Sequence, residues 1–272
     1  MFATRDGVRL FWTEQGRGEP LLLIMGLGAT HEFWGRFPAA CAPRYRTLLF
    51  DNRGAGQSDV PPGPYPIAEM AADAAAVLDA AGVEAAHVFG ASMGGMIAQE
   101  LALTFPSRVR SLVLGCTSCG GRDAIPARRE VLLALDARAT MPREQAAWTI
   151  APFIFDAATP RERIEEAMAT RLGATVSAEG YFAQLQGIRS WSGTRARLGS
   201  LTAPTLVVHG EHDDLVPPEN ARILASAIPG STLVMLPDAS HVFLTDQPER
   251  ATDAILSFLD ASAVTGPGAG IR

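Results

Sequence analysis

A serine between small residues is the first feature of this chain that could do chemistry. Residues 90–94 read Gly-Ala-Ser-Met-Gly, between a short apolar run at 87–89 and a stretch of helical character at 96–103. At such a strand-to-helix turn, a strained backbone can expose a serine hydroxyl at the helix N-terminus. Ordinary turns also contain glycine and serine, but glycine costs about 1 kcal/mol inside a helix, so these glycines need a steric reason. We therefore interpret Ser92 as a nucleophile.

A serine hydroxyl is a poor nucleophile at neutral pH, so Ser92 needs a general base and a group that orients this base. Among the five histidines, His241 is the strongest candidate because it follows the last expected strand and precedes the last expected helix. His212 also follows a strand. His209 lies within a strand run and is expected to belong to the core.

The orienting carboxylate is expected in the loop that follows the preceding strand, where Asp213 lies. Parallel strands end at the same edge of a sheet, so Asp213 and His241 should lie close together, and the order Ser92, Asp213, His241 suits this architecture. Asp214 stays an alternative, because composition alone does not separate adjacent carboxylates. Both carboxylates could instead cap the following helix. Asp238 lies too close to His241 in a tight loop and is expected to form an Asx turn.

Negative charge that develops on a carbonyl oxygen needs backbone N–H donors. One donor is expected at Met93, the first residue of the helix after Ser92. The second is expected at Leu27, in the glycine-containing loop 25–30, for which a plain glycine turn is the alternative reading. The loop 51–59 combines glycines with charged residues and is expected to support the site through hydrogen bonds.

Elements with two different periodicities alternate along the chain. Short apolar runs without alternation indicate strands buried on both faces, at 21–25, 47–50, 87–89, 109–114, 205–208 and 232–236. Helical patterns lie at 67–81, 93–105, 219–227 and 248–259. Residues 1–15 predict an antiparallel hairpin that turns at Asp6-Gly7. The alternation predicts an α/β fold with a mostly parallel twisted sheet flanked by helices.

Residues 121–200 interrupt this alternation, because they contain amphipathic helical patterns and no convincing strand. The helical patterns lie at 126–138, 143–155, 161–172 and 177–189. We interpret this part as a helical cap inserted into an α/β core made of residues 1–120 and 201–264. Residues 265–272 contain glycine and proline and predict a flexible tail.

A cap placed over the strand ends would close a substrate pocket. The candidates for its lining are Gly26, Trp148, Phe153, Tyr181, Arg189, Trp191 and Val242. For the aromatic residues of the cap, the alternative is that they only hold its helices together. For Arg189 or another arginine of the cap, the alternatives are a clamp on a substrate carboxylate and ordinary solvation at the surface.

The composition excludes several classes of function. The chain has 272 residues, a net charge of −6 and no long basic cluster, which argues against a nucleic-acid partner. All 23 basic residues are arginine, so lysine Schiff-base chemistry is excluded. Neither a histidine and carboxylate cluster nor a dinucleotide fingerprint appears, so we expect no metal and no organic cofactor. The three cysteines are expected to be buried thiols.

The expected partner is a small molecule. The first residues lack the charged and apolar regions of a signal peptide, and the longest apolar run near the start is far below the ~20 residues of a membrane span. We therefore expect a cytoplasmic protein without membrane association. The sequence leaves the oligomeric state open, with a homodimer as one alternative.

Taken together, these motifs resemble the α/β-hydrolase superfamily over most of the chain outside the expected cap. The similar segments are the loops 25–28 and 51–59, the turn 90–94, the loop 210–217 and the loop around His241. The resemblance implies a nucleophile, a base, an orienting carboxylate and two oxyanion donors at Ser92, His241, Asp213, Leu27 and Met93. Met25 departs from the pattern, since the family usually carries histidine there.

Within the superfamily, the chain is most similar to capped 3-oxoadipate enol-lactonases and bacterial carboxylesterases, through residues 92–99 and 180–189. This similarity implies a serine hydrolase that cleaves a carboxylic ester or lactone through an acyl-enzyme intermediate. Serine at the nucleophile position opposes the dehalogenase and epoxide hydrolase branches, which use aspartate. The alternatives are a carbon-carbon bond hydrolase or perhydrolase with the same triad, and a ligand-binding receptor with a hydrolase fold.

Overall fold

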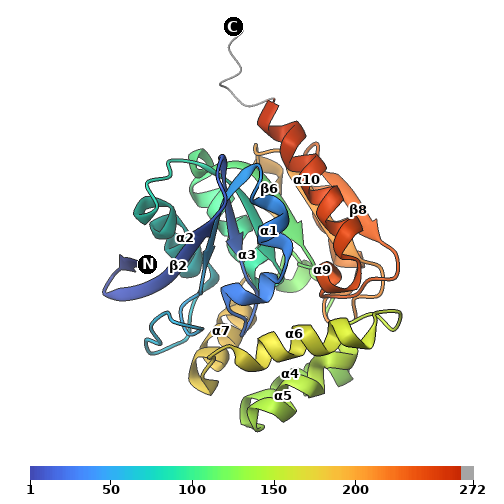
Figure 1. The fold of residues 1–272 in the computed structure, drawn as a ribbon. Helices are drawn as coiled ribbons and strands as arrows, with labels where there is room; N and C mark the ends of the chain where they lie inside the picture. Colours follow the sequence, from blue (N-terminus) through green and yellow to red (C-terminus); the bar gives the residue numbers. More distant parts are fainter. Residues whose placement is uncertain (265–272) are drawn as a thin grey trace, which may run out of the picture.

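A sheet of eight strands forms the centre of the protein in the computed structural model, which describes residues 1–264 (Figure 1). The strands are β1 (Phe2–Arg5), β2 (Val8–Gln15), β3 (Glu19–Ile24), β4 (Tyr45–Phe50), β5 (Ala86–Ala91), β6 (Val109–Gly115), β7 (Thr205–Gly210) and β8 (Thr232–Leu236). Their order is β1-β2-β4-β3-β5-β6-β7-β8. Strand β2 pairs antiparallel with β1 and β4, and the other pairings are parallel. The predicted mostly parallel sheet is therefore confirmed, whereas the predicted tail at 265–272 lies outside the described residues.

The predicted hairpin at the N-terminus consists of β1 and β2. Asp6 and Gly7 have φ angles of 50° and 79°, the left-handed conformations that a two-residue turn of this kind needs. At the centre of the sheet, by contrast, the side chains of Leu21, Leu22 and Leu23 in β3 are all fully buried. Both faces of β3 are covered, which explains its continuous apolar sequence.

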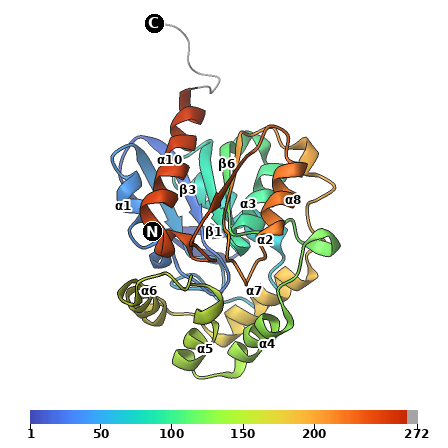
Figure 2. The same cartoon turned by 90° about the vertical axis from the view of Figure 1, so that its right-hand side faces the viewer.

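Helices cover both faces of the sheet and enclose an apolar core on each (Figure 2). Helices α2, α3 and α8 contribute Met70, Ile97 and Leu224 to one core, and α1 and α10 contribute Phe37 and Ile255 to the other. The bounds are α1 (Phe37–Cys41), α2 (Ile67–Ala80), α3 (Met93–Thr104), α8 (Glu219–Ala227) and α10 (Pro248–Val264). Within residues 1–264, every helix is too short or too polar to span a bilayer.

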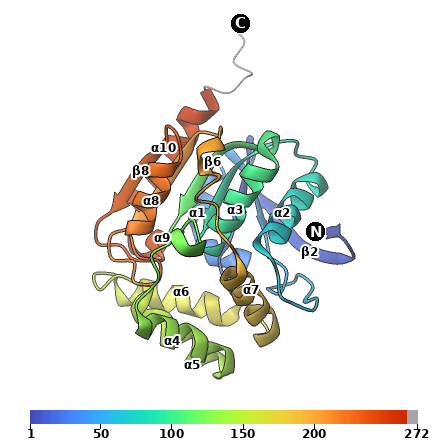
Figure 3. The ribbon, with the colours of Figure 1, turned by 180° about the vertical axis from the view of Figure 1, so that it is seen from behind.

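The chain between β6 and β7 forms a group of helices at one end of the sheet (Figures 1 and 3). These helices are α4 (Arg129–Ala137), α5 (Arg143–Ile150), α6 (Arg161–Gly173) and α7 (Ala178–Ser190). We call residues 121–200 the helical segment. It contains no strand beyond a single bridge from Val176 to Ala55. The helix expected at 143–155 ends at Ile150, because Pro152 lacks the N–H that a continuing helix requires, and a 3-10 turn follows.

The helical segment has a small apolar core of its own, which includes Val131, Ile150 and Met168. It is also attached to the loop after β8. The Val242 N–H donates to the Ile154 carbonyl oxygen at 3.0 Å. Further along, Thr159 Oγ1 donates to the carboxylate of Asp246 in α9 (Phe243–Asp246), at 2.6 Å. These bonds hold the helical segment over the carboxyl ends of the strands.

Candidate active site

Ser92 lies at the sharp turn between β5 and α3. Its φ of 57° and ψ of −122° fall in a region that residues other than glycine rarely adopt. The turn is held by strand β6 and the residues after it, because the Ser92 N–H donates to Gly115 O at 2.9 Å and Thr117 Oγ1 donates to Ser92 O at 2.7 Å. Ser92 lines a cavity at the strand ends. The strained backbone thus presents this residue to the cavity at the N-terminus of α3.

Glycines allow three elements to meet at Ser92. A Cβ on Gly94 would collide with the carbonyl of Ile24 in β3, and a Cβ on Gly90 would collide with the backbone of Gly94. A Cβ on Gly26 would lie 2.9 Å from the Cβ of Ser92. The glycines around Ser92 therefore have the steric reason that the sequence suggests, because β3, β5 and α3 approach more closely than side chains would permit.

His241 and Asp213 are brought together from the loops after β8 and β7. His241 Nδ1 lies 2.8 Å from Asp213 Oδ2, and the Asp213 carboxylate is fully buried. A carboxylate accepts hydrogen bonds, so Nδ1 carries the proton and Nε2 is left to accept one. The other oxygen of Asp213 accepts the N–H groups of Leu215 and Val216, at 2.9 and 2.8 Å. These contacts fix the carboxylate beneath the imidazole ring.

A second histidine contacts the same carboxylate. His209 Nε2 lies 2.8 Å from the carbonyl oxygen of Val216 and 3.2 Å from Asp213 Oδ2, so Nε2 carries a proton that faces both acceptors. Burial disfavours the ionised form of Asp213, but His241 and His209 outweigh it and lower the pKa of Asp213 to about 2. The sequence places His209 only in the core. Its position within a buried strand gives no indication of this contact.

Asp214 and His212, the alternatives to Asp213 and His241, have other partners. Asp214 is half-exposed and forms an ion pair with Arg128 at 2.9 Å. His212 Nδ1 lies 2.5 Å from Asp156 in the helical segment. Asp238 has a φ of 52° in the turn that follows β8. The geometry therefore shows which of the two adjacent carboxylates contacts His241, and composition alone could not show this.

Two backbone N–H groups beside Ser92 have no hydrogen-bond partner among the described residues, and they belong to Leu27 and Met93. Met93 is fully buried in the first turn of α3, where N–H groups lack an intrahelical partner. Leu27 follows Gly26, whose close approach to Ser92 brings the loop after β3 to the same point. Both residues line the cavity with Ser92. The pair has the arrangement of an oxyanion hole.

Buried amide side chains hold the loop that carries Leu27. Asn52 Nδ2 donates to the Met25 carbonyl oxygen at 2.8 Å, as expected of a supporting loop at 51–59. From helix α7, Gln184 accepts the Gly28 N–H at 2.9 Å and donates to the Arg53 carbonyl oxygen at 2.8 Å. Gln184 is fully buried. Sequence reasoning missed this residue, because a glutamine within an amphipathic helix looks like a solvated position.

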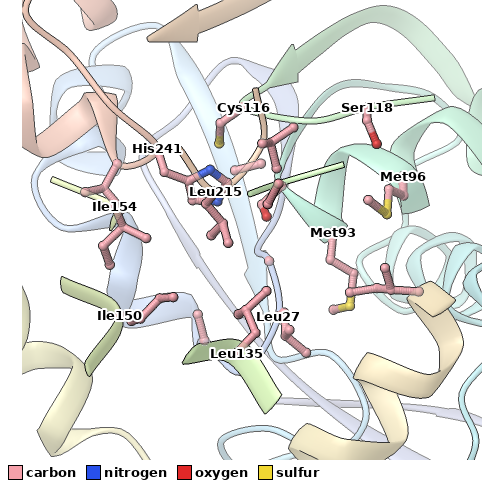
Figure 4. A pocket seen from close by; sticks show the side chains of 18 of the residues that line it. Leu27, Met93, Met96, Cys116, Ser118, Leu135, Ile150, Ile154, Leu215 and His241 are labelled. Carbon is pink, nitrogen blue, oxygen red and sulfur yellow. The ribbon is translucent and has the colours of Figure 1, made fainter. Parts of the chain in front are cut away.

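The cavity has a volume of about 470 Å³ and its lining is mostly apolar (Figure 4). Four of the residues that the sequence suggests for substrate contact line it, and they are Gly26, Arg189, Trp191 and Val242. Figure 4 shows His241 and Cys116 on one side, Met93 and Met96 on another, and Leu135 of α4 facing them. The helical segment and the strand-end loops thus enclose one space.

Three of the suggested residues lie elsewhere, so this part of the prediction needs correction. Trp148 points outward from α5 and is 42 % exposed. Phe153 packs against the apolar core of the helical segment instead. Tyr181 is buried, but its ring packs against Gly28, where a Cβ would come within 2.6 Å of it, and borders a second, smaller cavity. Helical periodicity does not tell which aromatic side chains of a small helical unit face the sheet.

Two arginines that the sequence analysis did not name also lie at the cavity. Arg138 and Arg171 line the large cavity from the turn after α4 and from α6. Both residues lie in polar helical stretches, where an arginine is usually solvated. The remaining lining from this segment is largely aliphatic, with Leu132, Leu135 and Ile150 among its members.

The arrangement can support nucleophilic chemistry at Ser92. His241 is hydrogen-bonded to Asp213 but makes no hydrogen bond with Ser92 Oγ in the part of the chain that the structure describes, although both side chains line the cavity. Such bonds are often long without a substrate and tighten when one binds. Among residues 1–264, no group of three or more histidine, cysteine or carboxylate side chains is placed to hold a metal. All three cysteines are buried free thiols, as expected.

The fold and the site together define a class of enzyme, the α/β hydrolases. The family model described as alpha/beta hydrolase fold matches residues 19–151 and 166–248. The chain belongs to this family.

Proteins from several bacteria are similar to the chain over almost its whole length. A candidate carbamate hydrolase of Azorhizobium caulinodans is 34 % identical over 254 residues, which are 92 % of this chain and 94 % of the relative. The solved enol-lactonase of Burkholderia xenovorans has a TM-score of 0.86 and 27 % identity, covering 96 % of this chain and 100 % of its own. A thermophilic esterase of Thermogutta terrifontis has a TM-score of 0.84 and 28 % identity, covering 96 % and 98 %.

Proposed function

We propose that this protein is a serine hydrolase that cleaves a carboxylic ester or lactone through an acyl-enzyme at Ser92. The observation that carries the proposal is the meeting of three features in one cavity. They are a serine in a strained turn, two unpartnered N–H groups beside it, and a histidine oriented by a buried carboxylate. The similarity to an enol-lactonase and an esterase supports the class of substrate.

In the proposed reaction, His241 Nε2 takes the proton of the Ser92 hydroxyl as the oxygen attacks the carbonyl carbon. The carbonyl oxygen becomes negatively charged and accepts the N–H groups of Leu27 and Met93. His241 then gives its proton to the leaving alcohol oxygen, and the acyl-enzyme remains. Asp213 stabilises the imidazolium that forms in each half of the reaction.

In the second half of the proposed reaction, water hydrolyses the acyl-enzyme. His241 takes a proton from the water molecule, whose oxygen attacks the acyl-enzyme, and the proton passes to Ser92 Oγ as the acid leaves. A lactone follows the same path, except that the alcohol and the acid remain in one product molecule. The helical segment acts as a cap that closes the apolar space around the acyl chain.

The test is hydrolysis of 4-nitrophenyl butanoate by the parent protein and by Ser92→Ala. The variant should lose activity by about a thousandfold or more, since only the oxyanion donors and binding remain. Ser226→Ala, on the surface of α8, is the matched control and should keep the parent rate.

Equal turnover by the parent protein and Ser92→Ala would end the proposal. A burst of one equivalent of nitrophenol without further turnover would instead support a ligand-binding protein that retains the fold. If the parent protein accepts no ester or lactone but cleaves a vinylogous diketone, the carbon-carbon bond hydrolase takes the place of the esterase.

A further inference from the structure

The cavity that contains Ser92 carries positive charge and no negative charge. Its charged lining residues are Arg138, Arg171 and Arg189, and no aspartate or glutamate of the described chain lines it. This contrasts with a chain whose net charge is −6. Positive charge within low-dielectric walls attracts anions. Arg189 and Arg138 differ, however, in whether a carboxylate of the described residues forms an ion pair with them.

Arg189 has a carboxylate partner and is in contact with solvent. Its guanidinium forms an ion pair with Asp136, and both side chains are 48 % exposed. Its positive charge is therefore matched at the surface. The sequence-based idea of a clamp at Arg189 thus has a weaker basis than Arg138 provides.

Arg138 is partly buried and has no carboxylate partner among the described residues. Its Nε has no hydrogen-bond partner, and no aspartate or glutamate within residues 1–264 forms an ion pair with it. Its guanidinium lies 5.0 Å from the centre of the Tyr181 ring, and Nη1 donates to the Tyr181 hydroxyl at 3.4 Å. Burial raises the pKa of Tyr181, so this phenol stays neutral and supplies no negative charge.

Arg171 adds a second positive charge to the same place. It lines the large cavity together with Arg138, and both residues also line the adjoining cavity of about 180 Å³. Its guanidinium lies 5.2 Å from the centre of the Phe33 ring. Burial, and next the charge of Arg138, lower the pKa of Arg171 to about 9, so it remains protonated at neutral pH. Two like charges that line one cavity repel each other, and an anion bound between them would reduce this repulsion.

This pair of arginines is close to the candidate oxyanion loop. Gly28 follows Leu27 directly, and the Tyr181 ring packs on Gly28. Arg138 in turn covers the Tyr181 ring. One aromatic side chain therefore separates the loop that would hold the reacting carbonyl from the guanidinium of Arg138. A substrate that spans this distance could place a second polar group on the arginines.

We infer that Arg138 and Arg171 bind a carboxylate of the substrate, so that the enzyme prefers esters or lactones that carry a second carboxyl group. Guanidinium groups match carboxylate geometry and bind it with charge-assisted hydrogen bonds. The anion would satisfy the free Nε of Arg138 and neutralise a buried charge. This inference rests on the proposed hydrolase function, because it assigns the substrate class of the same cavity.

The experiment compares two substrates that differ only in the distant charge, 4-nitrophenyl hexanoate and the 4-nitrophenyl half-ester of adipic acid. The measured quantity is the ratio of their kcat/KM values, half-ester over neutral ester. Arg138→Met should lower this ratio by about tenfold to a hundredfold, the range for a lost hydrogen bond to a charged group, and change kcat/KM of the neutral ester much less. Arg161→Gln, fully exposed on α6 beside Glu165, is the matched control and should keep the parent ratio.

Binding and stability provide readouts that do not need turnover. In the Ser92→Ala background, calorimetry should detect adipate binding, and adding Arg138→Met should abolish it. In the absence of ligand, Arg138→Met should have a Tm equal to or above the parent value, because it removes a partly buried charge that no carboxylate of the described residues neutralises. A purely structural arginine would instead lower Tm when it is replaced.

The possible results separate this inference from the proposed function. If the parent protein hydrolyses neither ester, the proposed function fails, while adipate binding still reports on the arginines. If the neutral ester is hydrolysed but Arg138→Met leaves the ratio and adipate binding unchanged, the carboxylate site is wrong. A lower Tm of Arg138→Met with equal losses on both esters would likewise overturn it.

Discussion

The strand-end loops and the helical segment line the same cavity but are built differently. The loops carry polar groups that are held by hydrogen bonds, as Asp213 is by the N–H groups of Leu215 and Val216. The helical segment contributes mainly aliphatic side chains, with three arginines and Trp191 as the exceptions. The geometry of the loops is therefore fixed by hydrogen bonds, whereas the helical segment shapes the cavity through its packed side chains. The comparison suggests that the loops determine the reaction and the helices determine the substrate.

The loops gain their precision from close backbone approach. Gly26, Gly90 and Gly94 bring β3, β5 and α3 together around Ser92, and the peptide geometry there permits little movement. The helical segment is joined to this frame by hydrogen bonds from its own loops and side chains, such as the bond from Val242 N–H to Ile154 O and those of Gln184 with Gly28 and Arg53. A change in its side chains can therefore alter the shape of the cavity without moving Ser92.

Replacing each of the adjacent carboxylates at 213 and 214 tests whether only one of them orients His241. Asp213→Asn should lower kcat by about ten-thousandfold on a neutral ester, because the amide favours the wrong tautomer of His241. Asp214→Asn should change kcat less than twofold, since Asp214 is half-exposed and pairs with Arg128. Steady-state kinetics of both purified variants checks this. Similar losses in the two variants would break the distinction between them.

The acid limb of the stability curve should also depend on Asp213. Its pKa in the folded state is about 2, below the ordinary 3.8, so it stabilises the fold above pH 4 and this contribution disappears as the pH falls toward 2. The contribution is about 2 kcal/mol. Between pH 4 and pH 2, denaturant unfolding should therefore show a steeper loss of stability for the parent protein than for Asp213→Asn. Parallel curves would contradict the buried ion-pair geometry.

His209 should have a smaller effect, because it acts through Asp213 and not on the substrate. His209→Phe removes the Nε2 hydrogen that faces the carboxylate and should lower kcat by about tenfold, with little change in KM. The acid limb of the pH profile of kcat/KM should also shift. The control is His87→Phe, which removes a buried histidine bonded to Ser111 away from the cavity. An unchanged profile in His209→Phe would show that the contact has no role in orienting the site.

The smallest predicted effect concerns two tryptophans of the helical segment. Trp191 lines the cavity and Trp148 does not. Trp191→Phe should raise KM for a hydrophobic ester by roughly threefold to fivefold, since it removes part of the apolar wall. Trp148→Phe should leave KM within about twofold of the parent value. Equal effects on KM would mean that Trp191 forms no part of the wall that contacts the substrate.

The sequence predicted the sheet and the flanking helices because their signals are local. Strand β3 is a continuous apolar run, and α8 was expected at the same bounds, 219–227, that the structure has. The one-turn helices α1 and α9 were missed, since elements of five and four residues are too short to show a period.

The site was only partly predictable, for a physical reason. Ser92, Asp213 and His241 are found from their positions after strands, because the topology of a parallel sheet brings strand ends together. No such rule fixes how amphipathic helices rotate over the sheet. The sequence therefore suggests Trp148 and Tyr181 for the cavity, while Arg138 and Arg171 face it instead. Contacts such as His209 with Asp213 depend on side-chain geometry that spacing does not encode.

The most direct test of the account is covalent labelling of the nucleophile. The parent protein is incubated with an alkyl 4-nitrophenyl phosphonate, whose phosphorus accepts an activated serine oxygen and whose tetrahedral product mimics the acyl-transfer intermediate. Mass spectrometry of the intact protein and of its peptides then locates the adduct. The account predicts one phosphonyl group on Ser92, and none on Ser92→Ala under the same conditions. An adduct on another residue, or an unlabelled parent protein that still hydrolyses esters, would contradict it.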